Sequence, residues 1–368
     1  MNLFPNTIVF PARTLTGAGV IARLLAECVG FGRRGIIVHG HSLVKHGVLA
    51  RILQATPAGC QVKSWEHTGG EPTLKDLDCL LTFAREHRAD WVAGVGGGSV
   101  LDLAKACAGL YLAAETPLKY HQGAPLETRG IPFIAAPTTA GTGSEATINS
   151  VLTDPDTRVK KSIRDPMLIA RLVLLDPDLL AHCPKSVIAH SGMDAFTQAV
   201  EAYTSRHASW MSDTFALKGV ELIAANLEAV YREGTIEQCQ GLLAGSYLAG
   251  LGFSMGRLGV VHGLAHPLGF RYHVPHGLVC GVCLPYAIEL NRDAMGVKYE
   301  SLSRAIGADL LTWTLRMLEC LQMASPFKGK AIIEKATIIK ETLPAWSTQA
   351  NPKPITPQDV EWLLSRLF

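Results

Sequence analysis

Short apolar runs alternate with amphipathic segments through the first half of the chain, and this alternation is the strongest constraint on its fold. Apolar runs at residues 36–38, 91–95 and 133–136 predict strands. Helical patterns precede and separate them, for example at residues 19–28 and 74–88. Strands that alternate with helices predict an α/β fold of the Rossmann-like kind, with a mainly parallel sheet and helices on both of its faces.

The second half has a different pattern, in which strand signals fade and long helical periods take over. A chain of 368 residues exceeds the usual size of one domain, so we expect two domains. The boundary falls near Asp176 and Pro177, which gives an α/β domain over residues 1–177 and an all-α domain over residues 178–368. The longest helical patterns cover residues 195–203, 210–231 and 236–251.

Composition and charge exclude several classes of protein. The net charge of +2 is too small to indicate binding to nucleic acid or to an anionic membrane. No apolar run approaches the ~20 residues that span a bilayer, and we find no basic start followed by the apolar core of a secretion leader. The nine cysteines are scattered and odd in number, which is typical of reduced thiols in the cytoplasm.

Cys280 and Cys283 form a C-x-x-C pair, a spacing found in metal and redox sites. They lie in an apolar run, LVCGVCLPYAI, and no second pair accompanies them. We therefore favour two buried small side chains over a metal-binding or redox pair.

Two glycine-rich loops follow predicted strands. The first is GVGGGS, residues 94–99, which opens the helical pattern at residues 100–110. Glycines let a backbone approach a phosphate and a helix N-terminus supplies free amides, so this loop is a candidate phosphate cradle. A tight strand-to-helix turn without a ligand is the alternative. The second loop is PTTAGTGSE, residues 137–145. Open parallel sheets bind ligands at the carboxyl ends of their strands, so each loop strengthens the other.

A cluster of histidines lies in the segment VVHGLAHPLGFRYHVPHG, residues 260–277. His262 and His266 are four apart, so on a helix they project from one face. We expect Pro267 to break this helix and His276 to return on a Pro-His-Gly turn. Converging imidazoles suit iron, zinc and similar ions, and a set of satisfied core histidines is the alternative.

A carboxylate that would complete a histidine site lies in the segment GMDAFTQAVEAY. Asp194 and Gln198 are four apart at the expected start of a helix and share a face. An ordinary helix cap or first-turn acid is the alternative for Asp194.

A zinc protease of the H-E-x-x-H type is disfavoured, because Gly263 stands where that motif has its catalytic glutamate.

Together these motifs give the sequence a resemblance that covers nearly the whole chain. The segments GVGGGSVLDLAKA, PTTAGTGSEATINSVLTD, GMDAFTQAVEAY and VVHGLAHPLGFRYHVPHG resemble, in order and spacing, the iron-containing (group III) alcohol dehydrogenases of the dehydroquinate synthase-like fold. The residues in these motifs most resemble those of lactaldehyde–propanediol oxidoreductases. The resemblance implies an N-terminal dinucleotide-binding domain, a C-terminal helical metal-binding domain, and an active site in the cleft between them.

The resemblance also implies roles for particular residues. Cofactor positions are Gly97, Gly98 and Ser99 at the pyrophosphate, Thr138, Thr139 and Thr142 beside it, and Asp102, Asn149 and Lys160 further along. Metal-ligand positions are Asp194, His262 and His276, and His266 matches a histidine near the nicotinamide that would relay the alcohol proton. Phe253, Arg257 and Leu258, expected on the same helix as the histidines, would line the substrate pocket.

Two positions depart from the family pattern. A fourth ligand, a histidine, belongs at position 198, where this chain has Gln198. An amide oxygen is a weaker, neutral donor, so we expect looser metal binding, with zinc as an alternative to iron.

Many members that use NAD have an aspartate at position 40, which repels a 2′-phosphate. Here Gly40 is followed by His41 and Ser42, so no acid is expected to repel the phosphate and NADP should be accepted.

The sequence therefore predicts an NAD(P)-dependent, metal-assisted alcohol dehydrogenase or aldehyde reductase for short-chain substrates, using NADP or NAD and Fe²⁺ or Zn²⁺. We expect a cytoplasmic homodimer with no nucleic-acid or membrane partner. Arg257 and Arg271 near the histidines raise the alternative of a small anionic aldehyde as substrate. A same-fold lyase or cyclase, and a non-catalytic binding protein with a degenerate metal site, are further alternatives.

Overall fold

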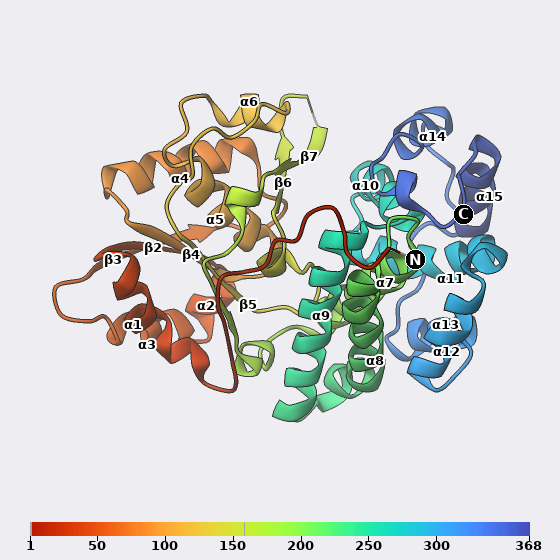
Figure 1. Cartoon of the computed structure of the whole chain (residues 1–368), viewed down its shortest axis with the longest axis horizontal. Coiled ribbons are helices and arrows are strands. Elements are labelled where there is room, and N and C mark those ends of the chain that lie inside the picture. Colours follow the sequence, from red (N-terminus) through yellow and green to blue (C-terminus); the bar gives the residue numbers. More distant parts are fainter. Residues whose placement is uncertain (1, 158) are drawn as a thin grey trace. The chain divides into compact units, whose positions relative to one another are not determined.

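The computed structural model describes residues 2–157 and 159–368, and the chain forms two compact units (Figure 1). The sheet unit comprises Val9–Thr139 and Ser144–Cys183. The helical unit comprises Pro184–Phe368, the N-terminal segment up to Ile8, and the short stretch Ala140–Gly143. The chain thus passes between the units at Cys183 and Pro184, a few residues after the position near 177 expected from the sequence.

The sheet unit is built on six strands in the order β1-β8-β5-β4-β2-β3, and every neighbouring pair is parallel. This confirms the expected α/β fold with a parallel sheet. The strands are β1 (Thr14–Thr16), β2 (Arg34–Gly40), β3 (Gln61–His67), β4 (Trp91–Gly96), β5 (Phe133–Pro137) and β8 (Leu172–Leu175). A separate antiparallel pair is formed by β6 (Asn149–Asp154) and β7 (Val159–Arg164).

Helices cover both faces of the sheet. Alternate residues of each central strand point to opposite faces, so both faces carry apolar side chains that must be covered. Ala93 and Val95 of β4 share a core with Leu24 of α1 and Ile52 of α3. The residue between them, Gly94, faces α5 on the other side. Figure 1 shows α1 and α3 on one side of the strands and α4 and α5 on the other. The helices of this unit are α1 (Leu24–Cys28), α2 (His41–Lys45), α3 (Val48–Gln54), α4 (Leu74–Glu86), α5 (Gly98–Leu110) and α6 (Pro117–His121).

Glycines at the end of β4 let α5 lie directly on the sheet. A Cβ added at Gly94 would stand 2.9 Å from Ala104 Cβ, and one added at Gly96 would stand 2.6 Å from Val100 Cβ. Such distances are well inside normal carbon contact, so a side chain at either position would push the helix away. These two glycines of the first loop therefore serve packing, and they fix where the N-terminus of α5 lies.

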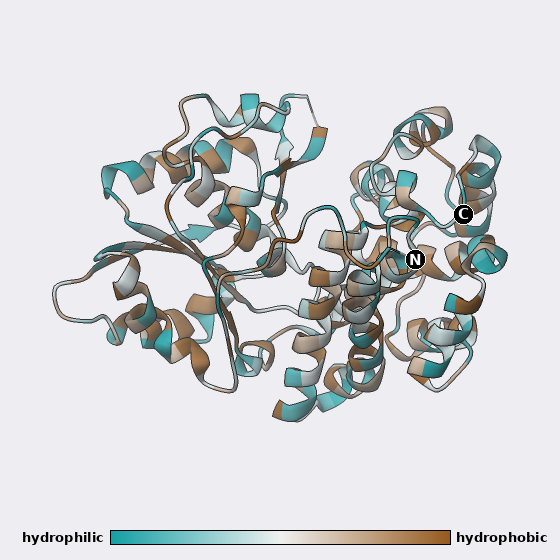
Figure 2. Cartoon of the chain, viewed as in Figure 1, coloured by the Kyte–Doolittle hydropathy of each residue, from teal (hydrophilic) through white to brown (hydrophobic). Residues whose placement is uncertain are grey.

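The helical unit has its core on α7, which packs against α8, α9 and α11. Figure 2 shows hydrophobic residues on the helices of this unit as well as on the strands of the other, so each unit has a core of its own. The helices are α7 (Lys185–Thr204), α8 (Trp210–Glu233), α9 (Ile236–Gly256), α10 (Val260–Tyr272), α11 (His276–Met295), α12 (Val297–Ile306), α13 (Leu310–Cys320), α14 (Lys335–Thr342) and α15 (Pro357–Leu367). The last helix begins with a capping box between Thr356 and Asp359.

Two expectations about helix ends are wrong. Pro267 does not break α10, which continues to Tyr272. The proline ring removes only one main-chain hydrogen bond, to the carbonyl of Gly263, and α10 is held along its length by α11 and α14. The histidines and the preceding pocket residues do not share one helix either. α9 ends at Gly256, and Arg257 has φ 67°, closing the last turn with a bond from its amide to the Phe253 carbonyl (2.8 Å).

Candidate functional site

Asp194 lies in the middle of α7, which begins at Lys185, and its side chain is buried. A helix cap or first-turn acid is therefore excluded for this residue. Its Oδ1 atom is buried and accepts no hydrogen bond. Burying a carboxylate oxygen without a partner is costly, so an unpaired oxygen at this depth indicates a position for a cation.

His262 is the third residue of α10 and directs its ring at Asp194. Its Nε2 atom is also buried without a hydrogen bond and lies 3.3 Å from Asp194 Oδ1. Its other nitrogen, Nδ1, lies 2.6 Å from Oε2 of the buried Glu201 on α7. An Nδ1–H donated to a carboxylate leaves the Nε2 lone pair for a metal, which is the usual arrangement around a ligating histidine.

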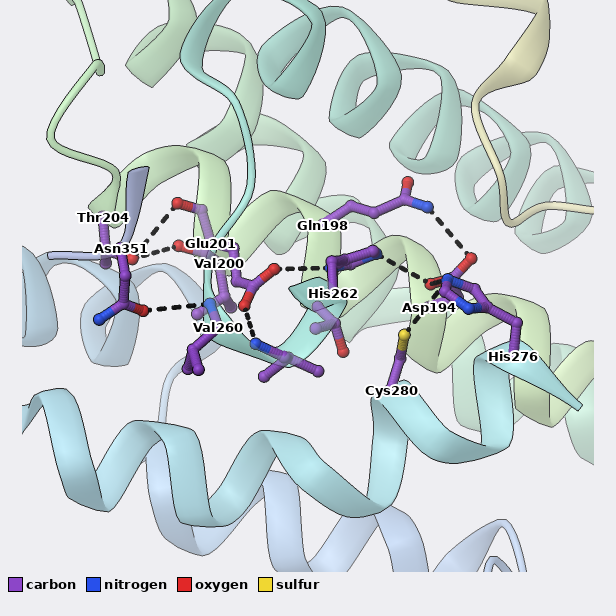
Figure 3. Close-up of polar contacts among 12 residues, drawn as sticks. Asp194, Gln198, Val200, Glu201, Thr204, Val260, His262, His276, Cys280 and Asn351 are labelled. Carbon is purple, nitrogen blue, oxygen red and sulfur yellow. Dashed lines mark hydrogen bonds and ion pairs between the residues drawn. The ribbon is translucent and has the colours of Figure 1, made fainter. Parts of the chain in front are cut away.

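Glu201 also accepts a hydrogen bond at the N-terminus of α10. The Val261 amide donates to its Oε1 (2.7 Å), where the helix dipole favours a negative charge. Gly259 makes room for this approach, since a Cβ there would stand 2.7 Å from the same oxygen. One carboxylate thus fixes both the start of α10 and the orientation of the first metal-facing ring (Figure 3).

His276 and Cys280 come from the first turns of α11. His276 is the first residue of this helix, directly after Pro275, so the expected turn ends in a helix. Gly277 lets α11 approach α7 closely, because a Cβ there would meet the His190 carbonyl at 2.2 Å. His276 Nε2 lies 3.7 Å from Asp194 Oδ1 and 3.5 Å from the sulfur of Cys280.

Asp194, His262, His276 and Cys280 form a compact group whose ligand atoms all lie within 4.8 Å of one another. Burial lowers the pKa of His262, but Cys280, Glu201 and Asp194 outweigh it and raise that pKa well above its usual range. The two carboxylates among these groups, Asp194 and Glu201, also favour a divalent cation. Aspartate, histidine and cysteine are ligands of iron and zinc, so these residues fit a transition-metal ion.

Gln198 lies beside this group but presents its amide nitrogen to it. Nε2 donates to Asp194 Oδ2 (3.1 Å), and Oε1 is buried without a hydrogen bond (Figure 3). An amide nitrogen is no metal ligand, so in this orientation Gln198 supports Asp194 rather than adding a donor.

His266 lies at the solvent side of the group. It is exposed, one turn along α10 from His262, and its ring stacks on that of His276 with centroids 5.1 Å apart. Its position next to a candidate ligand and in contact with water suits a group that exchanges protons with the solvent.

The expected pocket residues lie at the end of α9 and in the turn after it. Phe253 is buried in α9, whereas Arg257 and Leu258 follow its end. The guanidinium of Arg257 stacks on Trp346 (4.3 Å) and lies 3.4 Å from His207 Nε2. Among the described residues no carboxylate pairs with it. Arg271, by contrast, pairs with Glu341 (2.8 Å) and Glu334 (3.1 Å), so it is not available for an anionic ligand.

In the sheet unit, Gly97 precedes α5 and no side chain caps this helix. Gly97, Gly98 and Ser99 are partly exposed. The first amides of the helix are therefore open to an anion, as a phosphate cradle requires. Thr138 and Thr139 follow the neighbouring strand β5 and are also partly exposed. Thr142 is exposed and belongs to the stretch that groups with the helical unit.

The three further cofactor candidates form bonds within the sheet unit. Asp102 accepts from the Ser144 hydroxyl (2.6 Å) and from the Val151 amide (3.1 Å). Asn149 accepts from Arg164 (2.8 Å), and Lys160 pairs with Glu71 (2.5 Å). Asp102 thus joins α5 to the segment 144–151, and a structural role accounts for both of its oxygens.

Gly40 ends β2, and Ser42 is exposed in α2. The segment after β2 has no acid of its own, but an acid of the neighbouring strand lies beside it. Strand β3 pairs with β2 and places Glu66 opposite His39, and its Oε1 lies 3.0 Å from His41 Nδ1. The sequence around position 40 did not reveal this carboxylate because it comes from the neighbouring strand, 26 positions along the chain.

Two residues at this site, Cys280 of the metal group and Glu201 behind His262, were not identified as functional from the sequence, although their spacing carries a signal. Cys280 is four residues after His276, so on a helix both face one way. Glu201 is seven residues after Asp194, two helical turns along the same face. In the sequence, Cys280 stands out only as half of a C-x-x-C pair, and Glu201 only as part of the segment GMDAFTQAVEAY.

Comparisons with known proteins agree with this geometry. Two family models match in succession, iron-containing alcohol dehydrogenase over residues 11–177 and the C-terminal part of the Fe-containing alcohol dehydrogenase family over residues 188–368. The chain is 32% identical to lactaldehyde reductase of Escherichia coli K12 over 309 residues, 82% of this chain and 80% of that one. A 1,3-propanediol oxidoreductase structure matches with a TM-score of 0.93 and 26% identity over the full length of both chains. Sulfoacetaldehyde reductase of Bifidobacterium kashiwanohense in complex with NAD⁺ matches with a TM-score of 0.91 and 26% identity over 98% of both chains.

The chain belongs to the iron-containing alcohol dehydrogenase family, and the resemblance seen in the motifs is confirmed. It is an NAD(P)-dependent oxidoreductase that interconverts alcohols and aldehydes, and iron and NAD(P) are the cofactors of the family. No helix among the described residues is both long and apolar enough to cross a bilayer.

Proposed function

We propose that the chain interconverts a short-chain alcohol and its aldehyde at an ion held by Asp194, His262 and His276. The observation that carries this proposal is the pair of buried, unpaired ligand atoms, Asp194 Oδ1 and His262 Nε2, 3.3 Å apart. Among the described residues neither atom has a hydrogen-bond partner, and a divalent ion bound between them would satisfy both.

The chain's own residues divide the remaining work. When bound, the ion polarises a carbonyl oxygen or lowers the pKa of an alcohol, and the nicotinamide carries the hydride. Glu201 holds the tautomer of His262, and Gln198 holds Asp194 by donating to its second oxygen. His266 transfers the alcohol proton between the site and water, since its ring stacks on that of His276 and is exposed.

The cofactor is held by the two glycine-rich loops that follow β4 and β5. Gly97, Gly98 and Ser99 bind its pyrophosphate through the open amides at the start of α5. Thr138, Thr139 and Thr142 supply hydroxyls beside it, with Asn149 and Lys160 at its further end. Gly40 and Ser42 lie at the adenosine ribose, after the strand β2.

A reductase assay tests the function. The purified protein, stripped of metal, is mixed with NADPH or NADH and neutral short aldehydes such as propanal and lactaldehyde, with and without Fe²⁺ or Zn²⁺. We expect cofactor oxidation only when metal is added, and none in Asp194→Ala. The matched control Glu221→Gln changes an exposed acid of the same unit and should behave as the parent. Turnover without metal, or none with any short aldehyde, would overturn the proposal.

An anionic aldehyde is the second candidate substrate. It is favoured by Arg257, whose guanidinium meets a ring and an imidazole but no described carboxylate, and by likeness to a sulfoacetaldehyde reductase. A guanidinium that binds the substrate's charge should contribute about 2 kcal/mol or more. Arg257→Ala should then lower kcat/KM for an anionic aldehyde about 30-fold and leave a neutral one nearly unchanged. The control Arg206→Ala removes a neighbouring cation that bonds to the Gln349 carbonyl. Equal effects on both substrates would leave the neutral aldehyde as the better assignment.

We further propose a cytoplasmic homodimer. None of the nine cysteines forms a disulfide, as expected of a reducing compartment. Large hydrophobic side chains are exposed along the N-terminal segment, at Leu3, Phe4, Ile8 and Phe10. Exposed apolar groups of this kind favour contact with a second copy. Sedimentation velocity of the purified protein measures the mass, and a monomer at micromolar concentration would contradict the dimer.

A further inference from the structure

The sulfur of Cys280 completes the metal group. Cys280 is wholly buried on α11, and its Sγ lies 3.5 Å from His276 Nε2 and within 4.8 Å of the ligand atoms of Asp194 and His262. Figure 3 shows its side chain pointing toward Asp194 and His276 from the side opposite Gln198. Four donors of three kinds therefore converge on one point from α7, α10 and α11.

The distances between these donors match a four-ligand site. In tetrahedral coordination with metal–N and metal–O bonds of about 2.0 Å and metal–S bonds of about 2.3 Å, N and O donors lie roughly 3.3 Å apart and N and S donors roughly 3.5 Å apart. The structure has 3.3 Å between His262 Nε2 and Asp194 Oδ1 and 3.5 Å between His276 Nε2 and Cys280 Sγ, whereas His276 Nε2 and Asp194 Oδ1 are 3.7 Å apart, 0.4 Å more than the ideal. The sulfur thus lies at the distance of a ligand, whereas the Gln198 amide offers Asp194 its nitrogen.

We propose that Cys280 binds the metal as a thiolate and is the fourth ligand of the site, in place of the donor that Gln198 does not supply. This inference rests on the proposed function for the other three ligands. When the metal–sulfur bond forms, the S–H bond breaks and its proton passes to solvent, so no oxidant or reductant is consumed. A thiolate is softer than an imidazole or a carboxylate, so the site should prefer zinc over iron more strongly than a set of nitrogen and oxygen donors does.

Cobalt(II) substitution tests the sulfur directly. A thiolate bound to Co²⁺ gives an intense near-ultraviolet charge-transfer band, which nitrogen and oxygen donors do not. The metal-free parent titrated with Co²⁺ should develop this band to a stoichiometry of one. Cys280→Ser should bind Co²⁺ without the band. The matched control Cys283→Ser removes another buried sulfur from the same helix, outside the metal group, and should keep the band. A parent that binds Co²⁺ without the band, or a Cys280→Ser variant that retains it, overturns the proposal.

Metal affinity gives a second, independent measurement. Loss of the thiolate should weaken zinc binding by at least about tenfold, measured by competition with a chelator, and should weaken iron binding less. Cys280→Ala guards against a serine hydroxyl taking over as a ligand, and circular dichroism establishes that each variant is folded. Adding Gln198→His to Cys280→Ser should restore zinc affinity without restoring the charge-transfer band. An unchanged zinc affinity in both Cys280 variants contradicts the proposal.

The outcomes separate this proposal from the function on which it rests. Metal-dependent aldehyde reduction without a thiolate band would leave the dehydrogenase function standing and remove Cys280 from the ligands. A thiolate band lost in Cys280→Ser, together with no turnover of any short aldehyde, would leave the ligand set standing and remove the substrate assignment.

Discussion

Glu201 makes two hydrogen bonds, one to the ring of His262 and one at the N-terminus of α10. It accepts from His262 Nδ1 and from the Val261 amide at the start of α10, and it is buried. Its charge would therefore act through the imidazole ring on a metal bound at His262, because the ring becomes a better donor when a carboxylate accepts its other proton.

Neutralising Glu201 tests this role. Glu201→Gln keeps the size of the side chain and an oxygen for the Val261 amide, but removes the negative charge behind His262. We expect metal affinity to fall about 10- to 100-fold. Chelator competition with Zn²⁺ gives the dissociation constants, and Glu221→Gln on the exposed face of α8 is the matched control. If both variants bind zinc as the parent does, Glu201 serves only to fix the helix.

Residue spacing made part of this site predictable from the sequence. His262, His276 and Asp194 stand out because metal-binding residue types recur at helical or turn spacing. Cys280 and Cys283 are both buried, as expected, but the sequence did not reveal that the Cys280 sulfur lies beside His276, four residues before it. The orientation of the Gln198 amide is outside the reach of sequence analysis, since it depends on which oxygen of Asp194 faces the ligand atoms.

At the scale of elements, the strands and the order of strand and helix were predictable, and several helix ends were not. Strands β2, β4 and β5 read as continuous apolar runs because both of their faces are covered. The turn between α9 and α10 was missed because the residue with positive φ is Arg257, and only a glycine would have signalled it. The helix α10 runs through Pro267 because tertiary packing outweighs the loss of one hydrogen bond.

Gly96 and Gly97, in the loop before α5, should differ in their roles, one in packing and the other in cofactor binding. Substitution of each by alanine should separate the two effects. Gly96→Ala places a Cβ 2.6 Å from Val100 Cβ, so we expect a loss of stability of about 1–3 kcal/mol. Gly97→Ala meets nothing closer than 3.4 Å, so its stability should stay near that of the parent. Because Gly97 lies at the open helix N-terminus, its variant should instead weaken NAD(P)H binding. Urea unfolding and cofactor titration of both variants give the two numbers, and the reverse assignment of effects would refute this division.

The end of β2 and its neighbour β3 together set the cofactor preference that we predict. We expect NADPH to be accepted at least as well as NADH. Gly40→Asp should turn the preference toward NADH, because a carboxylate repels the 2′-phosphate, and a Cβ at this position has room, with Val100 at 3.8 Å. Glu66→Gln should act in the opposite direction, since it releases His41 from its ion pair. The cofactor preference is measured as the ratio of kcat/KM for NADPH to that for NADH, and Glu86→Gln is an exposed control. A parent that strongly prefers NADH would contradict the prediction.

At the scale of the whole molecule, the sheet unit contains a group of buried charges that its fold must accommodate. Lys105 is fully buried and donates to the Ser144 carbonyl (2.6 Å), to its hydroxyl (3.0 Å) and to the Asn149 carbonyl. Burial lowers the pKa of Lys105 to about 8. Burial also raises the pKa of Glu145 to about 7. A backbone hydrogen bond and Lys105 lower this pKa, but by less than burial raises it. These groups join α5 to the loop that follows β5, so their ionisation affects the stability of the unit that holds the cofactor loops.

The shifted pKa of Glu145 predicts how stability depends on pH. In the unfolded chain its carboxyl titrates near 4.5, and in the folded chain near 7. The folded state therefore holds the proton more tightly, and the stability from this group is fully present below pH 4.5 and lost as the pH rises through 7. The loss amounts to about 3.5 kcal/mol at most, from about 1.4 kcal/mol per pKa unit. Lys105 acts in the other direction, but only above pH 8, outside this window.

Glu145→Gln removes the titration while keeping the shape of the side chain. Stability is measured by urea unfolding, with hydrogen exchange of peptides from α5 as the readout. Between pH 5 and pH 7.5 the parent should lose more stability than the variant does. The difference between the two slopes isolates Glu145 from the other carboxylates, which titrate alike in both proteins. Glu86→Gln, an exposed acid on α4, should follow the parent. Parallel pH profiles for the parent and Glu145→Gln would mean that the folded protein does not hold the proton on Glu145 at pH 5.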